Sequence, residues 1–481
     1  MKILINDFGP LSEISFDLQK DIHLVYGKNA IGKSYAIYCI YCLLKSFKAS
    51  RMYLRREIIS SHYEDLMTTL IKKANAGDYD HVNVTADISR YYDSVYNEGF
   101  GEYLANSFQN TFSSLKSISN KLSNKNYCIR VILGDGKLTL QINGDKKGKP
   151  TFKLLGFEDK VTVIKKKTKS TKFSLYVNRK KKIGSPTEEE FYSEANRYIQ
   201  LFLYRVNELL YKEIGNLYFL PASRSGLYQA LNAFTPILAE LTQNRFFLQS
   251  KNIELPSLTE PLSDYFIDLS TINEKHINKK LIDLVDIIQD EILRGKVIYD
   301  SATKKISFKP NNVDIDLDLS ESSSMVAELS PIVLFIKHIL NNKYDDSGSY
   351  YRIHASYRLS RSINRNSMKE ILFIEEPEAH LHPEVQVKLM EVFSKLSSYG
   401  IKIFMTSHSN YMFNKINNLI LSDSINEKKI EVHHLVSTEQ GSKVNEGMSV
   451  SDEGIADDNF ASVSEALYME RLDILEKSNN D

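Results

Sequence analysis

One segment limits more than any other how this chain can fold: 22-IHLVYGKNAIGKSYAIYCIYCLL-44. Its apolar beginning is typical of a buried strand, its middle is a loop with two glycines, and its apolar end is long enough for a helix. The loop carries the pattern G-x-x-x-x-G-K-S, with Gly27, Gly32, Lys33 and Ser34 at the fixed positions. A strand, a glycine loop and a helix in this order predict a P-loop.

The residue types in this loop suit phosphate binding. Glycines let the backbone curl so that its N–H groups point at phosphate oxygens, and the following helix adds the positive end of its dipole. Lys33 is expected to reach the β- and γ-phosphates, and the Ser34 hydroxyl to bind Mg²⁺. We therefore predict an ATP site rather than a glycine turn that ends in Lys-Ser by chance. The predicted nucleotide-binding residues are Gly27, Lys28, Asn29, Ala30, Ile31, Gly32, Lys33 and Ser34.

A P-loop needs a neighbouring strand that carries an acid, and 370-EILFIEEPE-378 has that pattern. We expect Glu375 to hold Mg²⁺ and Glu376 to polarise the attacking water. A further buried strand, 401-IKIFMTSHSN-410, ends at His408, where a histidine can contact the γ-phosphate. Glu376, His408 and Lys33 are the predicted catalytic residues.

Zinc is the alternative use of the histidines that follow these acids. His380 and His382 are two positions apart, a spacing that suits neither one helical face nor a zinc finger. Cys39 and Cys42 form C-x-x-C inside an apolar run without a second pair, so we expect buried small side chains. Both observations favour nucleotide chemistry over a zinc site.

The charges of the chain balance, with 61 Lys+Arg and 61 Asp+Glu, so no overall field favours a polyanionic partner. The exception is 160-KVTVIKKKTKSTKFSLYVNRKKK-182, which has many lysines and no acid. It can hold nucleic acid, dock an acidic protein, or be a solvated hairpin whose lysines protect a strand edge. Three cysteines and no apolar run longer than 35–44 predict a cytoplasmic protein that does not cross a membrane.

With these motifs in order, the chain resembles an ABC-type ATPase of the RecF/SMC/OLD class. The resemblance rests on 1-MKILINDFGPL-11 as the first strands, 218-YFLPASRSGL-227 as the start of the helical lobe, 317-LDLSESSSMVAELSPIVLFIKH-338 as the signature helix, 374-IEEPEAHLHPE-384 as the second acid motif and 406-TSHS-409 as the histidine switch. It implies an α/β fold, a P-loop NTPase of ABC type with a helical lobe and a mixed α+β insertion.

The resemblance also implies a homodimer that holds two nucleotides between its subunits. A serine among Ser322, Ser323 and Ser324 is then expected to meet the γ-phosphate held by the other subunit; an ordinary helix N-cap is the alternative. The signature is not L-S-G-G-Q, and Glu375 stands where Asp is commoner, so we expect hydrolysis that this longer side chain can slow. Arg224 is expected at the nucleotide, at the dimer interface or in a surface salt bridge.

The remaining patterns divide the chain into segments. Two alternating runs joined by Gly-Asp-Gly, 127-YCIRVILGDGKLTLQING-144, predict a hairpin. The sequence contains no persistent heptad repeat, so we expect no coiled-coil arm. We expect 1–45 to form the N-terminal part of the ATPase lobe with the P-loop, 46–215 an insertion of helices and a small sheet, 216–318 a helical lobe with short strands, 319–445 the C-terminal part of the ATPase lobe, and 446–481 a tail helix.

The chain has the size of a stand-alone ATPase. It resembles the ATPase subunits of bacterial antiphage systems, most closely the AriA subunit of PARIS and then RloA-like and Septu ATPases. This implies a sensor ATPase that controls a separate effector, such as a TOPRIM-type nuclease, until a phage protein triggers it. The segment after His408 is too short for a nuclease domain of its own. The alternatives are a RecF-like DNA-binding ATPase of recombination or repair, with 160–182 as its DNA contact, and a slow nucleotide-dependent interaction switch.

Overall fold

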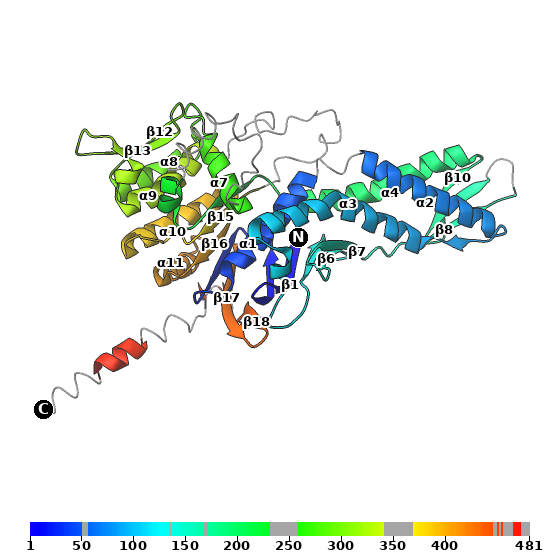
Figure 1. Cartoon of the computed structure of the whole chain (residues 1–481), viewed down its shortest axis with the longest axis horizontal. Helices are drawn as coiled ribbons and strands as arrows, with labels where there is room; N and C mark the ends of the chain where they lie inside the picture. Colours follow the sequence, from blue (N-terminus) through cyan, green and yellow to red (C-terminus); the bar gives the residue numbers. More distant parts are fainter. Residues whose placement is uncertain are drawn as a thin grey trace, which may run out of the picture.

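The computed structural model describes residues 1–50, 56–134, 136–167, 172–230, 258–340, 369–445, 450–451, 454–455 and 465–472. Figure 1 shows a body built around a large sheet and an arm of long helices that reaches away from it. The N-terminus lies in the body. The final described helical segment, 465–472, lies apart from the body, on the side away from the arm (Figure 1).

The body is organised by one sheet of 11 strands. Its five strands from β11 to β17 are parallel, whereas those from β2 to β7 are antiparallel. In sheet order the strands are β11 (Leu217–Leu220), β15 (Glu370–Glu375), β16 (Ile401–Ser407), β3 (Ile22–Gly27), β17 (Ile430–Thr438), β18 (Gly441–Val444), β2 (Leu11–Asp17), β1 (Lys2–Phe8), β5 (Cys128–Leu133), β6 (Leu138–Gly144) and β7 (Pro150–Leu155).

The parallel strands are rich in apolar residues because both faces of this part of the sheet are covered. Every residue of β3 and β16 is buried, as continuous apolar runs in parallel sheets predict. Successive residues of β3 enter different cores, since Val25 packs with one buried cluster while Leu24 and Tyr26 pack with the other. The sheet thus separates two hydrophobic cores and places the ends of its parallel strands along one edge.

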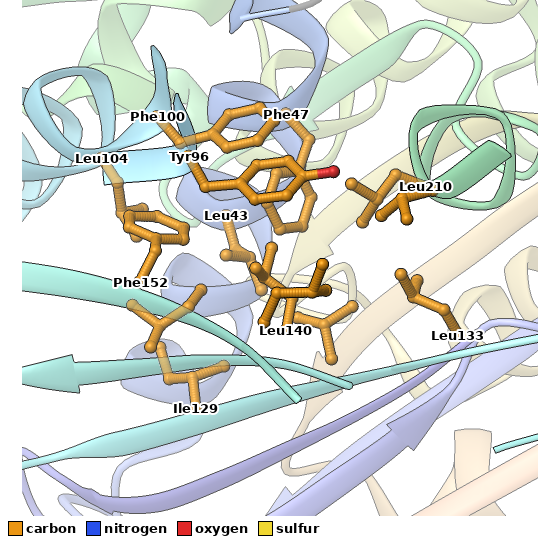
Figure 2. Close-up of a cluster of buried hydrophobic side chains, with 14 of the residues drawn as sticks. Leu43, Phe47, Tyr96, Phe100, Leu104, Ile129, Leu133, Leu140, Phe152 and Leu210 are labelled. Atoms are coloured by element: carbon orange, nitrogen blue, oxygen red, sulfur yellow. The ribbon is translucent and has the colours of Figure 1, made fainter. Parts of the chain in front are cut away.

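Helices cover the two faces of the sheet. The first core takes in α1 (Lys33–Ser50) and α3 (Thr85–Phe112), and the second takes in α9 (Ser324–Leu334), α10 (Pro383–Ser398) and α11 (Asn410–Leu421). Figure 2 shows how Leu43 and Phe47 of α1 lie among Tyr96 and Phe100 of α3 and Leu140 of β6. The helix that follows the P-loop is therefore fixed along one of its faces by the inserted segment.

The arm combines α2 (Arg56–Ala76), α3 and α4 (Glu188–Tyr211) with a four-stranded sheet near its far end (Figure 1). The strands of this sheet are, in order, β10 (Lys180–Ser185), β9 (Phe173–Val177), β8 (Val161–Lys165) and β4 (Val82–Asn83). The predicted hairpin is confirmed as β5 and β6. However, these strands join β1 of the main sheet rather than a small separate sheet, because Ile3 and Ile5 pair across strands with Val131 and Ile129.

The helical lobe is described in part. Its helices are α7 (Glu260–Ser270), α8 (Ile282–Asp286) and the π-helical η2 (Ile287–Leu293), and its strands are β12 (Gly295–Asp300), β13 (Lys305–Pro310) and β14 (Leu317–Asp318). Helices and short strands thus lie before the signature helix in the described residues from 258 onward, while residues 231–257 of the predicted helical lobe lie outside the described part of the chain. The short elements that remain are η1 (Leu115–Ile118), η3 (Leu319–Glu321), η4 (Phe335–Ile339), η7 (Glu427–Lys429), β19 (Val450–Ser451) and β20 (Gly454–Ile455).

The described helices include none with the length and apolar character needed to cross a membrane. The predicted tail helix corresponds to the helical residues 465–472, and the rest of that prediction lies outside the described residues.

Candidate functional site

The P-loop connects β3 to α1, as the sequence predicts. Gly27 and Gly32 adopt φ angles of 141° and 96°, which other residues rarely adopt. A Cβ atom on Gly27 would lie 2.7 Å from the carbonyl oxygen of Leu435, and one on Gly32 would lie 2.8 Å from Cγ of Pro10. Both glycines are therefore required by close packing as well as by backbone conformation. The loop is a cradle that ends at a helix N-terminus, which suits a phosphate group.

Lys33 lies folded over this loop. Its ammonium group donates hydrogen bonds to the carbonyl oxygens of Gly27 (3.1 Å) and Lys28 (2.9 Å), and Nζ lies 3.5 Å from Nδ1 of His408. Burial lowers the pKa of Lys33, whereas the charges of Glu376 and Glu378 oppose that change. The cation thus stands where the three predicted motifs converge.

Ser34 and Glu375 come together although more than three hundred positions separate them in the chain. Glu375 ends β15, is buried, and accepts a hydrogen bond from the hydroxyl of Tyr38 (2.8 Å). Burial raises the pKa of Glu375, while the nearby hydroxyls of Ser34 and Tyr38 lower it. A hydroxyl and a carboxylate oxygen side by side are the donor set that Mg²⁺ prefers, and a divalent cation would offset the buried negative charge. The residues present therefore fit the predicted metal.

Glu376 and His408 form the outer part of the site. Oε1 of Glu376 lies 3.3 Å from Nε2 of His408, and both side chains are partly exposed. Glu376 has a φ of 40°, a strained conformation of the kind that gathers at functional sites. Burial and the charge of Lys33 lower the pKa of His408, whereas Glu376 opposes them. The imidazole lies between Lys33 and Glu376 and favours the neutral form.

Glu378 belongs to the site, although the sequence analysis gave it no role. Its Oε1 accepts hydrogen bonds from the hydroxyl of Ser407 (2.9 Å) and from the backbone N–H of His408 (2.5 Å). Burial raises the pKa of Glu378. This carboxylate therefore holds the turn that presents the histidine. The available signal was the third acid of E-E-P-E, which Pro377 separates from the two acids that were given roles.

Arg224 corrects one prediction. It was expected at the nucleotide, at a dimer interface or in a surface salt bridge, but its side chain is fully buried. The guanidinium donates to the carbonyl oxygens of Pro221 (2.8 Å) and Glu375 (3.1 Å), and its Nε lies 3.2 Å from Oε2 of Glu328. Its fork of donors is satisfied inside the protein, which explains why it does not face outward. Glu328, which was missed, is the lone acid of the apolar helix α9.

The three signature serines lie at the N-terminal end of α9, which begins at Ser324. The hydroxyl of Ser323 is the N-cap and accepts a hydrogen bond from the Val326 N–H (3.4 Å), and the hydroxyl of Ser322 donates to the carbonyl oxygen of Asp318 (3.1 Å). Ser323 and Ser324 are exposed. The N-cap interpretation is thus confirmed for Ser323, whereas contact with a second subunit's nucleotide stays a prediction.

The histidines considered for zinc have other positions. His380 is exposed, and His382 is the N-cap of α10, where its ring accepts from the Glu384 N–H (3.4 Å). Neither belongs to a group of three metal-ligating side chains within the described part of the chain. Cys39 and Cys42 are buried free thiols, as predicted.

A comparison with protein families decides the class of this arrangement. The model of the AAA ATPase domain matches residues 1–413, a range that contains the P-loop, both acids and His408. The chain belongs to the AAA ATPase domain family. For this AAA ATPase the predicted fold class is confirmed, an α/β P-loop NTPase of ABC type with a helical lobe and a mixed insertion. No curated protein sequence matches it.

Three solved structures of SMC head domains are similar to this AAA ATPase at low identity. The SMC head bound to the C-terminal winged-helix domain of ScpA is 9% identical with a TM-score of 0.37, over 92% of this chain and 96% of that one. The SMC head domain from Thermotoga maritima is 9% identical with a TM-score of 0.33, over 92% of this chain and 97% of that one. The SMC head with an extended coiled coil, bound to the C-terminal domain of ScpA derived from Pyrococcus furiosus, is 10% identical with a TM-score of 0.36, over 98% and 98%.

Proposed function

We propose that this AAA ATPase binds ATP with Mg²⁺ in the cytoplasm and hydrolyses it at the P-loop. The observation that carries the proposal is the contact of the Ser34 hydroxyl with Glu375, beside a histidine that lies between Lys33 and Glu376. These groups come from separate segments of the sequence and serve the parts of phosphoryl transfer that a protein supplies.

Each side chain has a chemical role in this proposal. The cradle of N–H groups holds the phosphates, and Lys33 turns from the carbonyl oxygens of Gly27 and Lys28 towards them. Ser34 and Glu375 hold Mg²⁺, which neutralises charge on the phosphates when bound. Glu376 orients the attacking water and accepts its proton, while His408 contacts the terminal phosphate. The partly exposed Glu376 carboxylate is open to water, as this role requires.

Nucleotide binding and phosphate release by purified protein test this proposal. We expect Glu376→Gln to keep ATP binding and to reduce phosphate release by about a hundredfold, because general-base catalysis contributes roughly 10²–10⁴-fold. Lys33→Ala is expected to weaken ATP binding by about tenfold or more, since charge-assisted hydrogen bonds are worth about 1.5–3 kcal/mol. Glu384→Gln, an exposed glutamate at the start of α10, is the matched control.

The wild-type protein separates the proposal from its alternatives. Phosphate release that depends on Mg²⁺ and falls in Glu376→Gln supports it. Tight ATP binding without measurable release contradicts hydrolysis and leaves the nucleotide-dependent switch, in which the longer Glu375 side chain slows turnover. Absence of ATP binding contradicts both.

The proposed dimer follows from the exposure of Ser323 and Ser324 at the N-terminus of α9, where backbone N–H groups and a positive dipole end favour an anion. We propose that two subunits close on two ATP molecules through this surface. Molecular mass in solution tests it: Glu376→Gln with ATP should double in mass, and Ser323→Glu should stay a monomer. A monomer in both cases contradicts it.

For the biological role we propose an antiviral sensor that controls a separate effector, such as a TOPRIM-type nuclease, and responds to a phage protein. The resemblance to ATPase subunits of antiphage systems supports this role. Purification of wild type and Glu376→Gln from the native operon with ATP tests it. A neighbour-encoded protein whose retention differs between the two forms supports the role, whereas its absence contradicts it.

A second candidate, a DNA-binding ATPase of repair, is favoured by one observation at the end of the arm. Lys180, Lys181 and Lys182 of β10 are exposed there, as are Lys167 and Lys172 beside the neighbouring strands. Exposed lysines on a short sheet suit contact with phosphates. In the same purification, DNA without a protein partner, and more of it with Glu376→Gln, indicates this role instead.

A further inference from the structure

Two histidines and a glutamate meet in the body, at a place that the nucleotide site does not use. His23 lies near the start of β3, and Glu431 and His433 lie in the adjacent parallel strand β17. His23 is in register with Glu431, and His433 is two positions further along β17. Because side chains of paired residues and of alternate residues share a face, all three point to the same side of the sheet.

The separations suit a metal ion. Nδ1 of His23 lies 3.1 Å from Oε2 of Glu431, and Nε2 of His433 lies 3.7 Å from the same oxygen. All three side chains offer ligand atoms that lie within 4.8 Å of one another. Two ligand atoms of a tetrahedral zinc site are about 3.3 Å apart, given Zn–N bonds of about 2.0–2.1 Å. Within the described part of the chain, this is the only group of three such side chains with its atoms so close.

The nitrogens of this cluster lack the partners that buried groups normally have. The side chain of His23 is fully buried and that of His433 is 4% exposed. Both ring nitrogens of His23 and Nε2 of His433 make no directed hydrogen bond within the described residues. The contact of His23 with Glu431 has the distance of a hydrogen bond but not its direction. Unsatisfied buried polar atoms are rare in proteins, and they often mark a place where an ion binds.

The surroundings hold the three side chains in place. The ring of His23 stacks on Phe404, with centroids 4.0 Å apart and planes inclined by 11°, and the ring of His433 lies 4.6 Å from that of Phe16. The backbone N–H of Asp17 donates to Oε2 of Glu431 (2.8 Å). Ligands fixed by aromatic packing and by a hydrogen bond to the carboxylate are typical of metal sites.

The protonation states agree with this use. Burial lowers the pKa of His23, and it lowers the pKa of His433 to about 4, so both rings are neutral at physiological pH. Burial raises the pKa of Glu431, but the neighbouring His23 and His433 outweigh this effect and hold the pKa at about 2. Lys402 adds a positive charge nearby, which is balanced in part by Asp21 at 3.6 Å. Neutral imidazoles and an ionised carboxylate are the forms that bind metals.

We propose that His23, Glu431 and His433 bind one divalent transition-metal ion of the zinc class, with water as a further ligand. Two imidazoles exclude Mg²⁺ and Ca²⁺ as the preferred ions, because these select oxygen ligands. The site would join β3 to β17, one strand from the N-terminal part of the chain and one from the C-terminal part. Since His23 lies at the end of β3 away from Gly27, we infer a structural role that is independent of ATP.

Cobalt titration of the full chain tests this proposal. Protein stripped with EDTA is titrated with Co²⁺ in excess Mg²⁺, which occupies the carboxylates of the nucleotide site, and visible absorption is followed. We expect one equivalent of Co²⁺ to bind and to be displaced by Zn²⁺. Glu431→Gln, which keeps the shape of the side chain, should weaken binding by about tenfold or more, as should His433→Gln. X-ray absorption of the wild-type cobalt protein should show two imidazole ligands.

Two variants are controls because each alters a histidine–glutamate pair without a third ligand. These are Glu98→Gln, beside His62 at 2.5 Å, and Glu376→Gln, beside His408 at 3.3 Å. Neither should change the titration. The proposal is overturned if the wild type shows no absorption band, if Glu431→Gln binds as the wild type does, or if Glu376→Gln alone removes the band. None of these readouts depends on ATP hydrolysis.

Discussion

Arg224 and Glu328 form a fully buried ion pair that connects helix α9 to β15, the strand that ends at Glu375. Nε of Arg224 lies 3.2 Å from Oε2 of Glu328, and the guanidinium also donates to the carbonyl oxygen of Glu375. The Glu328 carboxylate in turn accepts from the backbone N–H groups of Arg224 (3.1 Å) and Ser225 (3.2 Å). A displacement of α9 by a partner subunit would therefore act directly on the end of β15.

Removing one member of this pair should be costly. Glu328→Gln leaves the guanidinium buried without a counter-charge, so we expect the free energy of unfolding to fall by about 3–5 kcal/mol. ATP turnover should fall more than ATP affinity, because the pair supports β15 rather than the P-loop. Chemical denaturation and phosphate release measure the two effects.

The double variant Arg224→Met with Glu328→Leu is the informative control. Buried ion pairs replaced by apolar residues often lose little stability. We expect the double variant to lose less stability than Glu328→Gln, although the buried backbone groups that the pair satisfied lose their partners, and we expect turnover still to be reduced. Full turnover in the double variant would show that the pair has no positioning role.

Glu378 is predicted to position His408. Glu378→Ala removes the acceptor of the His408 N–H and of the Ser407 hydroxyl, and displacement of a catalytic group by about 1 Å can cost about a hundredfold in rate. We expect phosphate release to fall by about tenfold to a hundredfold with ATP affinity changed little. Glu384→Ala, on the surface nearby, is the control, and equal rates in both variants would contradict the prediction.

Asp268 is predicted to make stability depend on pH. Burial first, and the charge of Asp264 second, raise its pKa from 3.8 to about 7. The folded protein thus keeps a proton that the unfolded chain releases. The stability from this group is present below about pH 4 and is lost as the pH rises through 7, by at most about 1.4 kcal/mol per pH unit.

Thermal unfolding between about pH 5 and pH 8 tests whether stability falls with rising pH, as predicted. The stability of Asp268→Asn relative to that of the wild type should increase as the pH rises, since the amide stays neutral. Asp290→Asn, at an exposed acid, should follow the wild type across the range. A difference between Asp268→Asn and wild type that does not change with pH refutes the prediction.

The lysines of β10 give a prediction about nucleic acid. If the arm holds DNA, changing Lys180, Lys181 and Lys182 together to Gln should weaken DNA binding. The slope of the logarithm of the binding constant against the logarithm of the salt concentration should fall in magnitude by about one for each phosphate that the protein no longer neutralises. Changing Lys146 and Lys147, which are exposed in another turn, should have no effect. An equal weakening of DNA binding by both sets of changes indicates only non-specific attraction.

The features that sequence analysis predicted are those with local signals. The P-loop, the strand that ends at Glu375, the strand just before His408, and the N-cap at Ser323 each occupy one continuous segment with a recognisable pattern. Their patterns follow from backbone geometry, burial and helix capping, which act over a few residues.

The features that it missed are contacts between distant segments. Arg224 with Glu328, and His23 with Glu431, depend on which strands and helices become neighbours, and hydrophobic periodicity carries no such information. The same holds for β5, whose alternating pattern predicts a strand but not its pairing with β1. Lone polar residues in apolar runs, such as Glu328 and His23, were the local indication of these contacts.

The position of β3 in the sheet also has a consequence for synthesis. This strand leaves the ribosome long before either of its neighbours, because β16 and β17 both begin after residue 400. At about 5–20 residues per second, translation separates β3 from β16 by about 20–80 s. During that time an apolar strand with two unpaired edges has no native partner. The nascent chain should therefore depend on chaperones until β16 and β17 emerge, and truncation before β16 should cause aggregation.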